Sequence, residues 1–149
     1  MITYARGTLV SPARSREEIE RTLARFGARD PLCITWKGKA AVIFEFNGKR
    51  VRIDADLPTE VRTPKGRKPL HPEQALDEAQ RQIWRAILVS VKGRLTEVEA
   101  GIKTFEEAFI GDILLPNGQT VGEFVIPKIE QAYLTGDMPP LLLLPGAGQ

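Results

Sequence analysis

The chain has 149 residues, of which 42% are hydrophobic and 27% are charged. This composition is ordinary for a single globular domain and too apolar for general disorder. No apolar run approaches the roughly 20 residues that a membrane-spanning helix needs. The single cysteine, Cys33, cannot form an internal disulfide, and the N-terminus lacks the apolar core of a secretory signal. We therefore expect a cytoplasmic protein with no membrane partner.

The charge is distributed unevenly, although the net charge is only +2. Residues 1–72 carry 15 Lys and Arg and 8 Asp and Glu, which gives +7, whereas residues 73–149 carry 6 and 11, which gives −5. Such an asymmetry predicts an acidic partner for the first half of the chain. The alternative is that the two halves attract each other, within one chain or between copies.

A short strand is expected at Ile2–Tyr4 or Thr8–Val10, and a helix that begins at Ser15 follows it. Ser15 and Glu18 have the spacing of a capping box, in which the two side chains satisfy free backbone N–H groups at the helix start. One apolar stripe at helical spacing follows, formed by Ile19, Leu23 and Phe26. Gly27 is expected to end the helix.

Three strands are predicted next, over Leu32–Lys37, Ala40–Phe46 and Lys49–Ala55. Asn47-Gly48 is the strongest two-residue hairpin signal, because both positions tolerate positive φ. Folding about this turn pairs Phe44 with Val51 and Val42 with Ile53, which places all four on the core face. The other face then carries Glu45, Arg50, Arg52 and Asp54. One apolar and one polar face are typical of an antiparallel sheet covered by a helix.

Residues 57–72 form a proline-rich basic loop that interrupts these patterns. A long helix is predicted from Pro72 to Ala100, a length of about 42 Å. A second capping box at Thr104 predicts a short helix, and residues 113–115 have the pattern of a short strand. A third box at Thr120 opens a last helix, which we expect to be interrupted or restarted at Pro127.

The predicted fold class is therefore α+β: a helix packed on a small antiparallel sheet, followed by a helical C-terminal region with one long helix. The sheet region spans residues 1–57, the basic loop 58–72 and the helical region with its apolar tail 73–149. We expect the three to form one compact domain.

The sequence contains no glycine-rich phosphate loop, C-x-x-C or H-E-x-x-H motif. The only histidine, His71, excludes metal sites that need two, and we expect it to have a loop or capping role. Cys33 has no basic activator nearby in the sequence, so we expect a buried thiol. We predict no catalytic residue, no metal and no cofactor.

One acidic cluster needs separate consideration, formed by Glu45, Asp54 and Asp56. Carboxylates on one sheet face could hold Mg²⁺, as a nuclease would need. The cations beside them, among them Arg50 and Arg52, favour a solvated face of cross-strand charge pairs instead.

Basic residues near the predicted turns, together with one nearby tryptophan, favour nucleic-acid binding. Cations that track phosphates and an aromatic ring that stacks on a base are typical of such surfaces. The predicted binding residues are Trp36, Lys37, Lys39, Lys49, Arg50, Arg52, Arg62, Lys65, Arg67 and Lys68. The alternative is ordinary surface charge, with Trp36 in the core beneath the first helix and lysines that discourage edge-to-edge aggregation.

The C-terminal tail suggests self-association, because its four consecutive leucines must be covered by some surface. These are Leu141, Leu142, Leu143 and Leu144. Together with the apolar face of the long helix, they predict a homo-oligomer.

Four stretches of the chain are similar to one family. They are Arg14–Arg21, Arg81–Arg85, Thr104–Glu107 and Met138–Leu141. On these stretches the chain resembles a group of small proteins of tailed bacteriophages and prophages, a group with no established activity. The resemblance implies phage DNA metabolism, host takeover or virion assembly as the context, and the host cytoplasm as the compartment.

Our leading functional hypothesis is a non-enzymatic, nucleic-acid-binding accessory protein that contacts the backbone or a single strand. The alternative is a protein–protein module, either a structural phage protein or a factor that inhibits a host protein. An enzyme is the third hypothesis.

Overall fold

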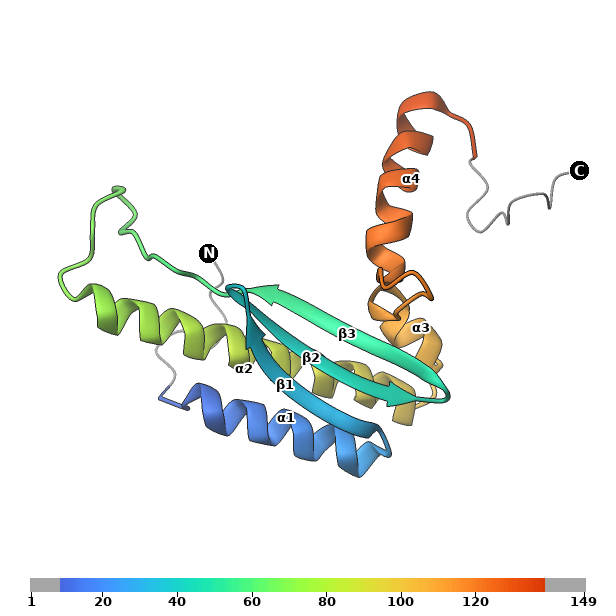
Figure 1. Ribbon diagram of the computed structural model, residues 1–149, viewed down its shortest axis with the longest axis horizontal. Coiled ribbons are helices and arrows are strands. Elements are labelled where there is room, and N and C mark those ends of the chain that lie inside the picture. The colour runs from blue at the N-terminus through green and yellow to red at the C-terminus, as the bar shows by residue number, and fades with distance from the viewer. Residues whose placement is uncertain (1–8, 139–149) are drawn as a thin grey trace, which may run out of the picture.

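The computed structural model describes residues 9–138, and Figure 1 shows their arrangement. The elements are α1 (Pro12–Phe26), β1 (Arg29–Trp36), β2 (Lys39–Phe46), β3 (Lys49–Asp56), α2 (Pro72–Glu99), α3 (Phe105–Phe109), the 3₁₀ turn η1 (Ile110–Asp112) and α4 (Val121–Thr135). The α+β fold, with a helix on an antiparallel sheet and one long helix after it, is confirmed. No helix within these residues is both long and apolar enough to cross a membrane.

Helix α1 begins three residues earlier than we expected. Ser11 caps it by accepting a hydrogen bond from the Arg14 N–H at 3.2 Å, and Pro12 occupies the first helical position. The predicted capping box at Ser15 is therefore wrong, because Ser15 is buried within the helix. The Ser-Pro pair prevails since proline lacks the N–H that a first-turn residue leaves unsatisfied anyway.

The three strands form an antiparallel sheet in the order β1-β2-β3. Strands β2 and β3 pair in the predicted register, with Phe44 opposite Val51 and Val42 opposite Ile53. All four side chains are buried. Asn47 and Gly48 have φ angles of 51° and 71°, the left-handed conformation that this two-residue turn requires. The hairpin prediction is confirmed.

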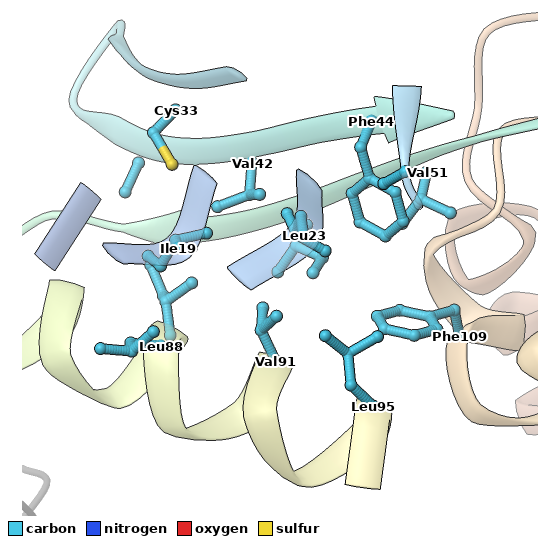
Figure 2. Close-up of a cluster of buried hydrophobic side chains, with 14 of the residues drawn as sticks. Ile19, Leu23, Cys33, Val42, Phe44, Val51, Leu88, Val91, Leu95 and Phe109 are labelled. Carbon is cyan, nitrogen blue, oxygen red and sulfur yellow. The ribbon is translucent and has the colours of Figure 1, made fainter. Parts of the chain in front are cut away.

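Helices α1 and α2 cover one face of the sheet, and the core lies between them and the strands (Figure 1). Figure 2 shows Ile19 and Leu23 of α1 near Val42, with Leu88 and Val91 of α2 beyond them. These side chains are fully buried. In the described part of the chain no helix lies over the other face, which we call the open face.

The C-terminal elements attach at the end of the sheet where the β2–β3 turn lies (Figure 1). The capping box at Thr104 is confirmed. Residues 113–115 form single bridges rather than a strand: Ile113 pairs with Val51, and the Leu114 N–H donates to the Arg50 carbonyl at 2.8 Å. The interruption that we predicted at Pro127 is wrong, since α4 is continuous. The fixed φ of proline is itself helical, so one hydrogen bond is lost while the turn continues.

Candidate nucleic-acid interface

The predicted binding residues divide between the two ends of the sheet. Strands β1 and β2 meet at one end, where β3 finishes and the loop over residues 57–71 begins (Figure 1). The Leu57 N–H donates to the Gly38 carbonyl at 2.9 Å, which joins the loop to the β1–β2 turn. We call this the basic end. It carries Trp36, Lys37 and Lys39 at the β1–β2 turn, and the loop that leads away from it carries Arg62, Lys65, Arg67 and Lys68. Lys49, Arg50 and Arg52 lie nearer the opposite end, which we call the far end.

Trp36 stands on the open face, and 65% of its surface is exposed. Cys33 pairs with Val42 and faces the core, so strand alternation directs Trp36, three residues on, to the other side. The alternative that buried Trp36 beneath the first helix is therefore wrong. The tryptophan that fills the core is Trp84 of α2, which is 2% exposed.

The two lysines beside Trp36 are held only loosely. The Lys37 ammonium lies 4.8 Å from the centroid of the Trp36 ring, within the range of a cation–π contact. Lys39 Nζ lies 3.7 Å from Asp56 Oδ1, and both side chains are more than half exposed. Such surface ion pairs contribute little to the stability of the fold. An anionic ligand can therefore displace Asp56 from Lys39 at a small cost in free energy.

The loop over residues 57–71 presents its cations on a tight turn. The Thr63 N–H donates to the Arg67 carbonyl at 2.8 Å, and the Arg67 N–H donates to Thr63 Oγ1 at 3.2 Å. Lys65, Arg67 and Lys68 are exposed and form no ion pair within residues 9–138, whereas Arg62 pairs with Glu60. The loop therefore places three uncompensated positive charges at the basic end.

Two of the three cations at the far end have structural partners instead. Lys49 Nζ contacts Glu106 Oε1 of α3 at 3.1 Å. Arg52 contacts Asp54 Oδ2 and Glu123 Oε1, each at 2.8 Å, and the hydrogen bond with Asp54 is the main cause of a raised Arg52 pKa. Because Glu123 belongs to the first turn of α4, Arg52 ties that helix to the sheet. Arg52 lies on the polar face as predicted but is only partly exposed, and its role in nucleic-acid binding stays a prediction.

The acidic side chains on the open face do not form a metal site. Asp54 is bound by Arg52 of its own strand, and Asp56 faces Lys39 across the strands. Between residues 9 and 138, no three His, Cys, Asp or Glu side chains gather closely enough to hold a metal ion. The interpretation as cross-strand charge pairs is confirmed for Asp56 alone, because the partner of Asp54 belongs to the same strand.

Cys33 is the buried thiol that we expected. Burial is the main cause that raises its pKa to about 12, and the charge of Glu20 adds to the effect. The Glu20 carboxylate also accepts the Cys33 backbone N–H at 2.9 Å. Cys33 is therefore an unreactive core residue. The hydrogen bond to Glu20 also satisfies one backbone N–H of β1, which is an edge strand of the sheet.

A surface hollow of about 360 Å³ lies on the side of α1 that borders α2. Both carboxylates that line it are paired: Glu17 contacts Arg21 at 2.6 Å, and Glu18 contacts Lys92 at 2.7 Å. The hydrogen bond from Lys92 is the main cause of a lowered Glu18 pKa. We interpret this hollow as an ion-pair seam between two helices rather than as a ligand site.

Two surfaces were missed by reasoning from sequence. Leu32 and Ile34 share the open face with Trp36, and strict alternation along β1 could have shown it. Helix α4 has no fully buried residue, although its composition is apolar. Sequence alone gave no sign of this, because apolar spacing on a helix predicts a buried face.

No family model, curated protein or solved structure matches this chain. The resemblance to phage proteins therefore stays a prediction, and the functional argument rests on the residues themselves.

Proposed function

We propose that this protein is a non-enzymatic nucleic-acid-binding protein that contacts backbone phosphates at its basic end. One observation carries the proposal: Lys37 at the β1–β2 turn, and Lys65, Arg67 and Lys68 on the loop that leads away from the same end of the sheet, are exposed and have no ion-pair partner in the described residues. Cations of this kind bind the phosphates of a nucleic acid well, because each contact releases a counterion that was condensed on the phosphate backbone.

The cations of the long helix α2 differ from this group. All four cations of α2 have a carboxylate partner: Arg81, Arg85, Lys92 and Arg94. By contrast, residues 57–71 carry four cations and a single carboxylate, Glu60, which already pairs with Arg62. The loop therefore keeps a local excess of positive charge, which favours a polyanionic ligand. The buried free thiol of Cys33 agrees with a reducing compartment, and we place the protein in the cytoplasm.

The test is fluorescence anisotropy with labelled DNA and RNA at low salt, followed by a salt titration. The affinity should fall steeply as the salt concentration rises. In a plot of log K against log salt concentration, each phosphate contact should contribute a slope of about −0.7 to −0.9. Lys65→Glu combined with Arg67→Glu should weaken binding at least about tenfold and reduce the slope. Arg25→Glu combined with Arg29→Glu is the matched control, because both arginines are exposed, have no ion pair in the described chain and lie toward the far end. Absence of binding to any nucleic acid at low salt would refute the proposal.

A second candidate function, protein binding or self-association, is favoured by helix α4. Tyr133 and Leu134 are 89% and 82% exposed, and Ile126 is 55% exposed. The long helix is not the self-association face that we expected, because Leu88 and Val91 are buried in the core of the same chain. The predicted interface at Leu141–Leu144 lies outside the described residues.

This second function is tested by light scattering at rising concentration. If α4 mediates association, Ile129→Lys should shift a dimer or larger assembly to monomer. Lys128→Glu is the control on the same helix, since it changes charge but leaves the apolar side chains intact. A wild-type protein that remains monomeric at high concentration would exclude self-association and leave a different protein as the partner.

A further inference from the structure

The open face of the sheet carries an apolar row along β1. Leu32 and Trp36 are 49% and 65% exposed, and Ile34 between them is half-buried. Because alternate residues of a strand point the same way, neighbouring members of the row are about 6.6 Å apart. The row ends at the β1–β2 turn, where Lys37 follows Trp36 and Lys39 begins β2. Apolar surface and positive charge are therefore neighbours at this turn.

We infer that the nucleic acid held at the basic end is single-stranded and that one of its bases stacks on Trp36. The inference rests on the proposed function and names its substrate class. The bases of a duplex are stacked against one another, so an indole on a flat surface cannot reach their faces. An unpaired base has a free face, and stacking on an aromatic side chain is the usual way in which proteins use it.

The shape of the open face also disfavours a duplex. The major groove of a double helix admits a helix or a two-stranded ribbon. The row here lies within a three-stranded sheet, and Trp36 lies opposite Lys39 of the neighbouring strand. A single strand can lie along such a surface, with bases toward the apolar row and phosphates toward the cations of the turn.

The cations beside Trp36 suit the phosphates of the same strand. Lys37 keeps its ammonium 4.8 Å from the ring centroid, so a base on Trp36 brings its own phosphate near that charge. The weak Lys39–Asp56 pair can exchange its carboxylate for a phosphate oxygen. Lys65 and Arg67 offer further positive charge on the loop that leads away from this end.

The experiment compares a single-stranded oligonucleotide with a duplex of the same sequence and length at the same low salt. The single strand should bind more tightly. Trp36→Ala should weaken its binding roughly 5- to 150-fold, the range for loss of one stacked base, and change duplex binding little. Trp36→Phe should recover part of the loss. Tyr133→Ala is the matched control, because Tyr133 is also an exposed aromatic but lies on α4.

Tryptophan fluorescence gives an independent readout. Trp84 is 2% exposed, so its emission should not respond to the ligand, and quenching by the single strand should vanish in Trp36→Ala. Equal affinity for both forms, with Trp36→Ala unchanged, would overturn this inference and leave the proposed function intact. No binding of either form would overturn both. A thermal melt of each variant checks that the fold is retained.

Discussion

The two ends of the sheet use similar residues for different purposes. At the far end, Lys49 and Arg52 pair with carboxylates of α3 and α4, and Phe44 contacts Phe105 and Phe109 of α3. At the basic end, Trp36 and the loop cations contact few side chains of the described chain and face solvent. The type of a residue therefore does not reveal its role. The partners available at its position decide whether it stabilises the fold or stays exposed to solvent.

The largest difference should appear when one aromatic residue is removed from each end. Phe109 is fully buried, with ring centroids 5.5 Å from Phe44 and 5.1 Å from Phe105. Phe109→Ala should lower the free energy of unfolding by about 3–5 kcal/mol, since it leaves a cavity. Trp36→Ala should change it by no more than about 0.5 kcal/mol. Urea denaturation measures both, and a large loss of stability in Trp36→Ala would contradict the comparison.

A smaller effect should follow from the cations. Arg52 is partly buried and holds both Asp54 and Glu123, so Arg52→Ala should cost about 1 kcal/mol after allowance for solvent screening. The amides of α4 should then exchange hydrogen faster, because the helix loses a tie to the sheet. Lys65→Ala should alter neither stability nor exchange. Hydrogen exchange with mass spectrometry distinguishes the two variants, and unchanged exchange in α4 after Arg52→Ala would show that the tie is unimportant.

The smallest effect concerns the acid titration of Glu106 at the far end. Its own backbone N–H, and then the hydrogen bond from Lys49, hold the pKa of Glu106 below its usual value of 4.5. A depressed pKa contributes stability above pH 4.5 that is lost as the pH falls through the lower, folded value. Lys49→Ala should move the pKa of Glu106 up towards 4.5, which an NMR titration of its carboxyl carbon would detect. The same pKa in both proteins would mean that Lys49 does not act on Glu106.

The local elements were predictable from the sequence because their determinants lie within a few residues. Asn47-Gly48 fixes the register of β2 and β3, and Thr104 with Glu107 starts α3. Where two local signals competed, as Ser11-Pro12 and Ser15 did, sequence reasoning chose the wrong one. The first pair supplies both a capping side chain and a proline suited to the first helical position, whereas Ser15 is buried inside the helix that results.

The division of the cations into structural and free ones was decided only by the tertiary structure. Lys49 and Glu106 are 57 residues apart in the sequence, and Arg52 and Glu123 are 71 apart. No periodicity or turn pattern in the sequence can predict such an ion pair, because it forms only when distant elements pack together. Composition by itself therefore showed a basic half of the chain, and the packing of α3 and α4 against the far end left the basic end free for a ligand.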